Sequence, residues 1–453
     1  EKSMPNGEKY DLVVIGFGKA GKTLAGKLAS QNKRVALIEK DARLYGGTCI
    51  NVGCIPSKRL VMEAGAAPQE PQEQPRFYEE AVRGKTELTR ALRAANYDKL
   101  VKAGVEVIDG TASFLDKNTI EVATAGGGSR VLSAEKFVIN TGSRPALPNI
   151  PGLEDNPLVY VSETMMDLTR LPRRLTIIGG GYIGLEFASL YANFGSQVTI
   201  LQHGSVFLPK EDADMATAIR AVLEAKGVTV LTEAAPQRIE GARVYYSKNG
   251  REEALDGDVV LAATGRTPNT ELLQAERAGI ELTERGTVRT DEHLRTSVEN
   301  IWAAGDVCGN LQFTYISLDD SRIILSDMAG DGRRTTRNRG AFSYALYIDP
   351  PFARVGMSEA EAAAEKRNYR VVTLPTAAIP KARVLKKTEG ILKAILEKDS
   401  GRILGAALLC PEAYEIINLI KLAMDHDIKA AELRDFIYTH PTMSEALNDL
   451  FAQ

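Results

Sequence analysis

Two cysteines lie five positions apart in a segment rich in glycine, Gly46-Gly-Thr-Cys49-Ile-Asn-Val-Gly-Cys54-Ile-Pro-Ser-Lys58. In one regular helix their Cα atoms would lie about 7.5–9 Å apart, which is too far for a disulfide. The pair must therefore lie where the chain bends into a helix, and Gly53 and Pro56 suit such a bend. A helix N-terminus would also stabilise a thiolate. The spacing predicts a redox-active dithiol.

The other cysteines indicate neither a disulfide-rich scaffold nor a metal site. Four cysteines in 453 residues are too few for such a scaffold. A closed zinc site needs four ligands, and the chain has no second Cys/His pair at ligand spacing. We expect Cys410 to lie in the core and Cys308, two residues after Asp306, to be an inert small side chain. No metal is predicted.

A glycine-rich turn follows the apolar run at residues 10–15. Gly16, Gly18 and Gly21 form the pattern GxGxxG, and residues 22–30 then show helical spacing. The next strand, at residues 34–39, ends in Glu39. Glycines let the backbone approach a pyrophosphate at a helix N-terminus, and an acid at this place can bind ribose hydroxyls. This turn predicts a dinucleotide site.

The same pattern returns about 160 residues later. A strand at 173–178 precedes Gly179, Gly181 and Gly184, and a helix and a second strand follow. Gln202 stands where an acid would favour NAD and repel a 2′-phosphate. Gln202 removes that repulsion, and His203 could hydrogen-bond the phosphate, so we expect NADPH with NADH tolerated.

Composition excludes several classes of protein. Lys plus Arg total 56 and Asp plus Glu 59, for a net charge of -3, which argues against a nucleic-acid or membrane-surface protein. No run of 18 or more apolar residues occurs, and residues 1–10 lack the apolar core of a signal peptide. We expect a cytoplasmic protein with a small-molecule substrate.

The order of these motifs resembles that of the class I pyridine nucleotide–disulfide oxidoreductases, over nearly the whole chain. The further matching segments are Thr141-Gly142-Ser-Arg-Pro145, Thr264-Gly265-Arg-Thr-Pro-Asn269, Ala304-Gly-Asp306 and His440-Pro-Thr-Met-Ser-Glu445. The resemblance implies that the first turn binds FAD, with Thr48, Thr141, Gly142, Gly265 and Asp306 in the cofactor sites. It makes Cys49 the thiol that meets the substrate and Cys54 the thiol beside the flavin. Lys58 and Glu186 match the family's ion pair near the flavin.

His440 and Glu445 lie far from the dithiol in the sequence. An imidazole can hold the proton that leaves Cys49, and a carboxylate can orient the ring. In the family this pair comes from the second subunit, so the resemblance implies a homodimer with a shared active site.

Lys19 and the segment Leu311-Gln-Phe-Thr-Tyr-Ile-Ser-Leu-Asp-Asp320 resemble the reactive-chlorine-resistance flavoproteins, among them hypothiocyanous acid reductases and copper(II) reductases. The expected substrate is an electrophilic oxidant, hypothiocyanous acid first. Gln202 departs from this group, which often has an acid there. Mercuric reductase would need a C-terminal cysteine pair, and none follows Cys410. Dihydrolipoamide dehydrogenase shares the dithiol, but Gln202 and Lys19 count against it. A flavin redox sensor or a subunit of a larger complex is the alternative of another class.

The expected fold is α/β. It has two Rossmann-like dinucleotide-binding domains, for FAD and NAD(P), and a C-terminal α+β dimerisation domain. The expected boundaries are 1–150 and 268–337 for the FAD domain, 151–267 for the NAD(P) domain and 338–453 for the dimerisation domain.

Overall fold

Both glycine turns follow a strand of a parallel sheet in a computed structural model of the chain, which describes residues 7–309 and 311–453. The chain forms two compact units. The first contains the chain up to Arg59 together with Arg83–Ala146 and Gly265–Arg339, and the second contains Leu60–Val82, Leu147–Thr264 and Gly340–Gln453. No helix of the described part is long and apolar enough to span a bilayer. The expected four-segment division stays a prediction.

The first unit is built on a six-stranded sheet in the order β1-β2-β3-β4-β5-β16, in which β1 also pairs with β5. Strands β3, β2, β1, β5 and β16 pair parallel in this order, whereas β4 pairs antiparallel with both β3 and β5. The elements are β1 (Glu8–Ile15), α1 (Lys19–Ala29), β2 (Val35–Glu39), α2 (Thr48–Val52), α3 (Cys54–Gly65), α4 (Gln74–Lys102), β3 (Glu106–Asp116), β4 (Thr119–Thr124), β5 (Ser129–Ile139), β6 (Ser143–Pro145), β15 (Arg266–Pro268), α8 (Ala275–Ala278), β16 (Ile301–Ala303) and α9 (Thr314–Ala329). The end of α3 and the start of α4, within Leu60–Val82, belong to the second unit.

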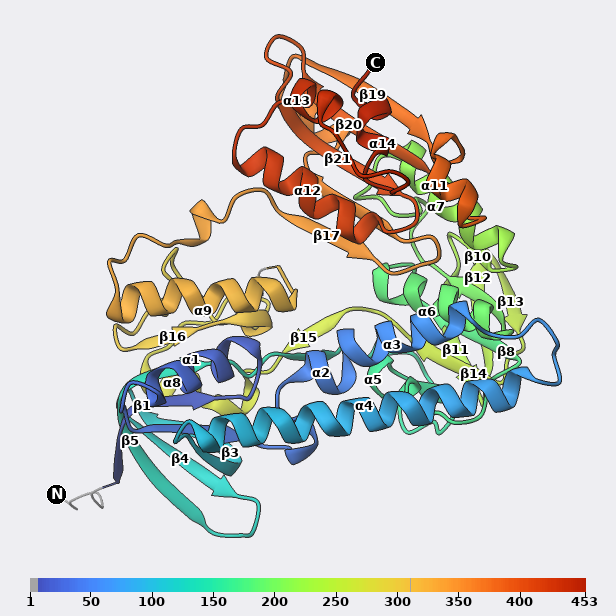
Figure 1. The fold of residues 1–453 in the computed structure, drawn as a ribbon. Helices are drawn as coiled ribbons and strands as arrows, with labels where there is room; N and C mark the ends of the chain where they lie inside the picture. Colours follow the sequence, from blue (N-terminus) through green and yellow to red (C-terminus); the bar gives the residue numbers. More distant parts are fainter. Residues whose placement is uncertain (1–6, 310) are drawn as a thin grey trace. The chain divides into compact units, whose positions relative to one another are not determined.

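The central strands of this sheet are covered on both faces. All five residues of β2 are buried, a pattern typical of parallel strands enclosed by helices. Helices α1 and α9 lie side by side (Figure 1), and their apolar side chains, such as Leu24 and Ile323, share one core with β1 and β2. The other face packs against the antiparallel strands β3–β5 and α8, with Phe114 and Phe137 in contact. The predicted α/β fold is confirmed.

The described part of the second unit holds three sheets. A five-stranded parallel sheet has the order β10-β9-β8-β14-β7, a three-stranded antiparallel sheet has the order β11-β12-β13, and a five-stranded antiparallel sheet has the order β17-β18-β21-β20-β19. Its elements are β7 (Val159–Tyr160), α5 (Ser162–Met165), β8 (Arg174–Ile178), α6 (Tyr182–Phe194), β9 (Gln197–Leu201), α7 (Ala213–Ala225), β10 (Thr229–Leu231), β11 (Ala235–Glu240), β12 (Arg243–Lys248), β13 (Arg251–Leu255), β14 (Val259–Ala262), β17 (Ser343–Leu346), β18 (Phe352–Gly356), α10 (Glu359–Ala364), β19 (Tyr369–Pro375), α11 (Pro380–Val384), β20 (Ile391–Glu397), β21 (Ile403–Leu409), α12 (Ala413–Asp425), α13 (Ala430–Asp435) and α14 (Ala446–Leu450).

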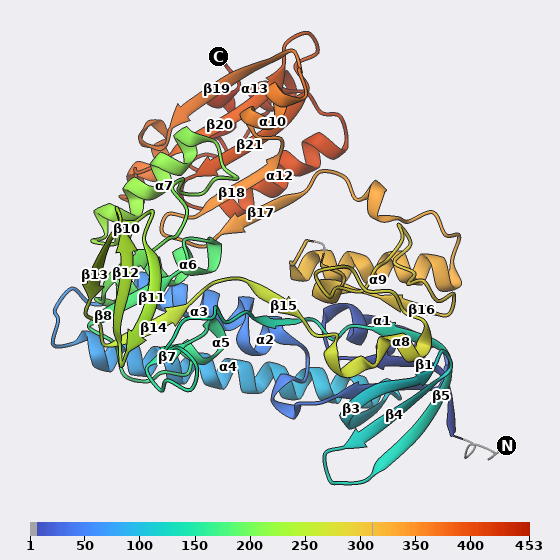
Figure 2. The same cartoon turned by 180° about the vertical axis from the view of Figure 1, so that it is seen from behind.

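One apolar core joins the two five-stranded sheets of the second unit. Leu185 and Phe187 of α6 and Met215 of α7 belong to the same buried cluster as Leu346 and Phe352 of β17 and β18. Helix α12 packs on β17, β18 and β21, as Figure 2 shows from behind. The start of α6, where the second glycine turn ends, is therefore held against the C-terminal sheet by packing within one unit.

Candidate active site

The first glycine turn is shaped by Asn140, which follows β5. Gly16 has a φ of 108°, and a Cβ there would overlap the carbonyl oxygen of Asn140. The Asn140 Oδ1 accepts a hydrogen bond from Gly21 N at 2.9 Å, and its Nδ2 donates to Ala304 O at 2.8 Å. Helix α1 begins at this turn without a side-chain cap, which leaves its N-terminus to an anion. The turn therefore fits the pyrophosphate of a dinucleotide.

Glu39 ends β2 beside this turn. One carboxylate oxygen accepts from Phe17 N and the other from Asp41 N, each at 3.1 Å. The residue is buried, and burial raises the pKa of its carboxyl group. The two backbone bonds hold the carboxylate in place, and a carboxylate oxygen can accept further hydrogen bonds from ribose hydroxyls.

The dithiol lies at a break between two helices, as the spacing predicted. Cys49 is in α2 and is partly buried, whereas Cys54 begins α3 and is exposed. Gly53 separates the helices, and a Cβ there would lie 3.0 Å from Thr48 O and 3.1 Å from the Cα of Cys49. Only glycine fits this bend without displacing the backbone that carries Cys49.

The segment that carries the dithiol packs on the first glycine turn. Gly47 precedes Thr48 with a φ of 98°, and a Cβ on it would lie 2.8 Å from the Cα of Gly18. The side chain of Lys22 in α1 donates from Nζ to Gly46 O at 2.8 Å. The dinucleotide turn and the redox-active segment are thus in direct contact within the first unit.

Three groups tune the thiols. The Cys54 Sγ lies 3.8 Å from the Oγ1 of Thr314, the first residue of α9. A hydrogen bond with Cys54, a hydrogen bond with Thr314 and the charge of Lys22 together lower the pKa of Cys49 to about 6, although burial opposes this. The hydrogen bond with Cys49 and burial raise the pKa of Cys54. The pair therefore titrates as a unit, with its first proton lost below the ordinary thiol range.

Among the other residues predicted to lie in the cofactor sites, Thr141 and Gly142 follow β5, Asp306 follows β16 and Gly265 precedes β15. The Asp306 Oδ2 accepts from Ser143 Oγ at 2.7 Å, and Thr141 Oγ1 donates to Asn269 O at 2.6 Å. Gly142 and Gly265 have φ values of 69° and 101°, with open space where a Cβ would lie. Carboxyl ends of parallel strands are where doubly wound sheets bind cofactors.

The second glycine turn repeats this construction in the second unit. Gly179 has a φ of 113°, and a Cβ there would overlap Ala263 O, just as Gly16 meets Asn140 O. Gly184 packs as closely on Gly179 O, whereas the space beside Gly181 is open. Gly181 precedes α6, which also lacks a side-chain cap. The turn fits a second pyrophosphate.

Gln202 lies across the second glycine turn. Its Nε2 donates to Gly204 O at 3.1 Å and to Val206 O at 2.8 Å, so both amide hydrogens serve the backbone. Its Oε1 faces Gly180. The side chain therefore presents an acceptor, not a donor, to an adenosine ribose. His203 is exposed and remains the predicted contact for a 2′-phosphate.

Lys58 and Glu186 belong to different units. Lys58 Nζ donates to Ser57 Oγ at 3.3 Å, and Glu186 Oε1 accepts from Tyr347 N at 2.9 Å. Their ion pair stays a prediction.

His440 and Glu445 contact each other in the second unit. The His440 Nδ1 lies 2.8 Å from Glu445 Oε1, and Thr442 N donates to the other carboxylate oxygen at 2.9 Å. The imidazole is 69% exposed, whereas the carboxylate is 15% exposed. Burial of Glu445 raises its pKa, but the bonds from Thr442 and His440 outweigh burial and lower it overall. The ring is thus oriented by a carboxylate with its other edge toward solvent, and its catalytic role stays a prediction.

Sequence reasoning missed Lys22, Asn140 and Thr314 as parts of the site. Lys22 directly follows the last glycine of the first turn, and Thr314 lies in the segment 311–320. Neither position carries a local pattern that indicates a contact with the dithiol. Asn140 directly precedes Thr141, and its place at the end of a buried strand was the available signal. Cys308 and Cys410 are both buried, as expected, and burial raises the pKa of Cys308.

Comparison with known proteins agrees with this geometry. Residues 10–321 match the family described as pyridine nucleotide-disulphide oxidoreductase, and residues 342–451 match its dimerisation domain. The chain is 46% identical over 445 residues to the probable pyridine nucleotide-disulfide oxidoreductase RclA of Escherichia coli, which covers 98% of this chain and 99% of that protein. A mercuric reductase of Lysinibacillus sphaericus is 32% identical over 98% of this chain and 82% of its own length.

The likeness extends to the three-dimensional fold of a solved structure. The Cu(II) complex of the HOCl-induced flavoprotein disulfide reductase RclA from Escherichia coli superposes with a TM-score of 0.93 at 46% identity, over 98% of this chain and 99% of that one. The family's enzymes use FAD and NAD(P)H, and the two glycine turns fit these two cofactors. The chain belongs to the pyridine nucleotide–disulfide oxidoreductase family and is an RclA-like flavoprotein oxidoreductase with a dimerisation domain.

Proposed function

We propose that this protein uses NAD(P)H to reduce an electrophilic oxidant at the Cys49–Cys54 dithiol, and that hypothiocyanous acid is this oxidant. The observation that carries the proposal is the lowered pKa of Cys49, in a helix break that packs on the first glycine turn. Thiolate is the nucleophilic form of cysteine, so the pair is reactive at neutral pH. The likeness to a flavoprotein induced by HOCl supports a chlorine- or thiocyanate-derived oxidant as substrate.

The first glycine turn and Glu39 would hold FAD, which would supply the transfer of two electrons from NAD(P)H to the Cys49–Cys54 disulfide. The reduced pair would then be one thiol and one thiolate. The Cys49 thiolate then attacks the sulfur of hypothiocyanous acid, forming a Cys49–S–SCN bond and releasing hydroxide. Cys54 gives up its proton, which neutralises the hydroxide to water. The Cys54 thiolate attacks the Cys49 sulfur, expels thiocyanate and restores the disulfide.

His440 supplies or holds the proton in these steps. Its ring is exposed in a single chain and is held by Glu445, which leaves its Nε2 edge for a second copy of the chain. We propose that the dimerisation domain brings this edge to the dithiol of the other subunit, so that each active site uses both chains. The domain matched at residues 342–451 contains both His440 and Glu445.

Copper(II) is the second candidate substrate, because a relative at 46% identity was solved as its Cu(II) complex. The reduced dithiol would give one electron to each of two Cu(II) ions, lose its remaining thiol proton and return to the disulfide, and thiolate ligands favour the Cu(I) that forms. The dithiol would serve both reactions, and the rates on the two substrates decide between them.

The test is NAD(P)H oxidation by the purified holoenzyme, with NADH and NADPH side by side. Hypothiocyanous acid, Cu(II), lipoamide, oxidised glutathione and Hg(II) are offered as separate substrates. Fast turnover confined to hypothiocyanous acid supports the proposal, and fast turnover of lipoamide with a negligible rate on hypothiocyanous acid contradicts it. Cys49→Ser should abolish turnover while FAD stays bound, and Cys410→Ser, a buried thiol, is the matched control.

A further inference from the structure

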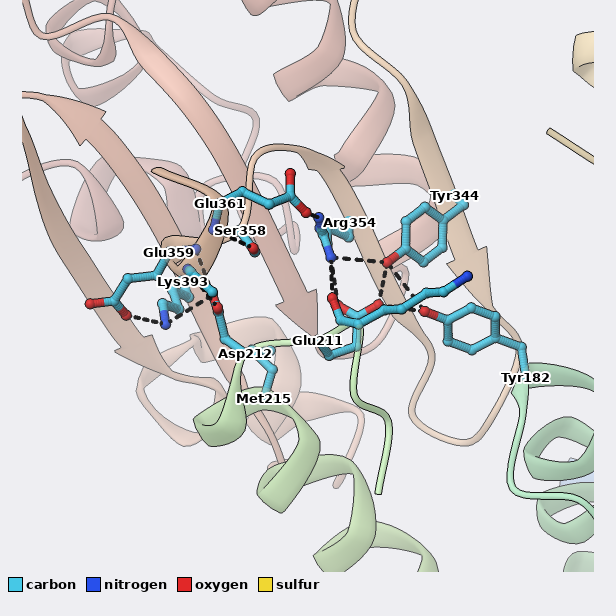
Figure 3. A network of polar contacts seen from close by, with 12 residues as sticks. Tyr182, Glu211, Asp212, Met215, Tyr344, Arg354, Ser358, Glu359, Glu361 and Lys393 are labelled. Carbon is cyan, nitrogen blue, oxygen red and sulfur yellow. Dashed lines mark hydrogen bonds and ion pairs between the residues drawn. The ribbon is translucent and has the colours of Figure 1, made fainter. Parts of the chain in front are cut away.

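The carboxylate of Glu211 is buried at the junction of the parallel sheet and the C-terminal five-stranded sheet in the second unit (Figure 3). Its side chain is 1% exposed. One oxygen accepts hydrogen bonds from the phenols of Tyr182, at 2.6 Å, and Tyr344, and the other lies 3.3 Å from Arg354 Nη1. Burial, together with the nearby charge of Glu211, raises the pKa of both tyrosines, so the phenols stay protonated donors.

Arg354 holds this carboxylate from β18. Its Nη1 also donates to Lys210 O at 2.9 Å, and its Nη2 donates to Glu361 Oε1 at 2.5 Å. The guanidinium is 9% exposed. The bonds to Lys210 O and Glu361 fix the guanidinium, so that Nη1 is held beside the Glu211 carboxylate.

A second cluster lies beside the first. Lys393, whose side chain is 1% exposed, is surrounded by Asp212, Asp214 and Glu359. The Asp212 carboxylate also accepts from Glu359 N at 2.9 Å and Ala360 N at 3.1 Å. This cluster ties the same loop before α7 to the C-terminal sheet through Asp212.

Stability alone does not explain the Glu211 cluster. Burying charges costs several kcal/mol of desolvation, and well-packed apolar residues often stabilise such a position as well. What the cluster adds is a defined place for the two phenols. The rings of Tyr182 and Tyr344 lie 5.7 Å apart, on the two sides of this junction.

Tyr182 connects the Glu211 cluster to the predicted nucleotide site. It directly follows Gly181 and begins α6, whose N-terminus has no side-chain cap. A nucleotide pyrophosphate binds at such an end through the first backbone N–H groups. The ring of Tyr182 points from this end toward Glu211 and Tyr344 (Figure 3).

We propose that Glu211, fixed by Arg354 of the dimerisation domain, is a positioning residue of the nicotinamide nucleotide site. By holding the Tyr182 hydroxyl, it keeps the ring in one rotamer against β17 and leaves the open space at Gly181 to the nucleotide. A ring released from this bond samples other rotamers at the start of α6. The fraction of molecules competent to bind then falls, and the apparent Kd rises by the same factor.

Tyr182→Phe is the direct test, since it removes only the anchored hydroxyl. The KM for NADH and NADPH, and the Kd for NADP⁺ and NAD⁺ measured by calorimetry on the holoenzyme, should rise roughly threefold to tenfold, the range of one ordinary intramolecular hydrogen bond. The kcat with ferricyanide as acceptor should change less than about twofold. Because ferricyanide replaces the physiological oxidant, this result does not depend on the proposed substrate.

Glu211→Gln is the second variant, and Glu359→Gln is the matched control. Glu211→Gln should raise the same KM and Kd at unchanged FAD content. Glu359 makes the same kind of bond to the buried cation of the neighbouring cluster, so Glu359→Gln should leave nucleotide affinity unchanged. An equal rise of KM and Kd in Glu359→Gln would contradict the proposal, because it would show that the Glu211 cluster only stabilises the junction of the sheets. An unchanged Kd in Tyr182→Phe would overturn the proposal, whether or not Glu211→Gln folds.

Discussion

Thr314 places its Oγ1 3.8 Å from the Sγ of Cys54, although 260 residues separate the two. The contact joins the start of α9 to the start of α3, within the first unit. These two helix ends lie side by side, and a hydrogen bond with the Thr314 hydroxyl helps to lower the pKa of Cys49. The reactivity of the pair therefore depends on a residue that no local pattern connects to it.

Thr314→Val should raise the first pKa of the reduced dithiol by about one unit, the equivalent of one hydrogen bond to a charged group. Valine keeps the shape of threonine and removes the hydroxyl. The pKa is measured from the pH dependence of iodoacetamide alkylation of the reduced holoenzyme. Thr314→Ser retains the hydroxyl and should keep the original profile. An unshifted profile in Thr314→Val would show that the Thr314 hydroxyl does not lower the pKa of the dithiol.

Lys22→Met should also raise the dithiol pKa, because it removes the cation that stabilises the Cys49 thiolate. Burial lowers the pKa of Lys22 itself to about 8. Its charge is therefore present throughout the range near pH 6 in which the Cys49 thiolate forms, so the substitution should move the whole transition to higher pH. Alkylation between pH 5 and 9 measures this shift. Lys27→Met, on the exposed end of the same helix, is the control.

The wild-type alkylation profile follows from the same pKa. The thiolate forms as the pH rises through about 6, so reactivity should climb there and level off by about pH 7. An unperturbed thiol would titrate near 8.5. A single transition near 8.5 in the reduced holoenzyme would contradict the tuned pair.

Gln202→Glu should weaken NADPH binding and leave NADH binding nearly unchanged. The wild-type amide donates both hydrogens to Gly204 O and Val206 O, so it neither repels nor binds a 2′-phosphate. A carboxylate would repel that phosphate and still accept from ribose hydroxyls. We expect the KM for NADPH to rise about tenfold, corresponding to roughly 1.4 kcal/mol. Equal shifts in the KM for NADPH and NADH would show that position 202 does not discriminate between a 2′-phosphate and a 2′-hydroxyl.

Gly53→Ala should destabilise the protein and slow the dithiol reaction. The added Cβ would meet Thr48 O at 3.0 Å and the Cα of Cys49 at 3.1 Å, so the backbone of α2 must shift. We expect a loss of about 1–3 kcal/mol in the free energy of unfolding, as for other overpacked sites. Gly65→Ala, at the end of α3 with open space around it, should be neutral or slightly stabilising. Urea unfolding of both variants compares them.

Mixed dimers test the shared active site. Neither Cys49→Ser nor His440→Gln homodimers should turn over hypothiocyanous acid at the wild-type rate. If each site takes Cys49 from one chain and His440 from the other, a co-expressed mixture should regain about a quarter of the wild-type activity, since half of the dimers have one intact site. A mixture that stays inactive would place both residues of a site in the same chain.

The glycine turns and the dithiol were predictable because their signals are local. Gly16 and Gly179 stand between a buried strand and a helix, and both have the positive φ that such a turn requires. The break at Gly53 followed from the length of a helix between two cysteines. The contact of His440 with Glu445, five residues on, lies within one local segment.

The tuning of these residues was not predictable in the same way. The contact of Lys22 with Gly46, the hydroxyl of Thr314 beside Cys54 and the buried Glu211–Arg354 pair join residues from 24 to 260 positions apart. The sequence alone determined which segments form strands, turns and helices, since apolar period, glycine freedom and cysteine spacing act over a few residues. Only the tertiary structure decided which of their side chains meet, because burial brings distant segments together and sets the charge, hydrogen bonds and pKa values that each group meets.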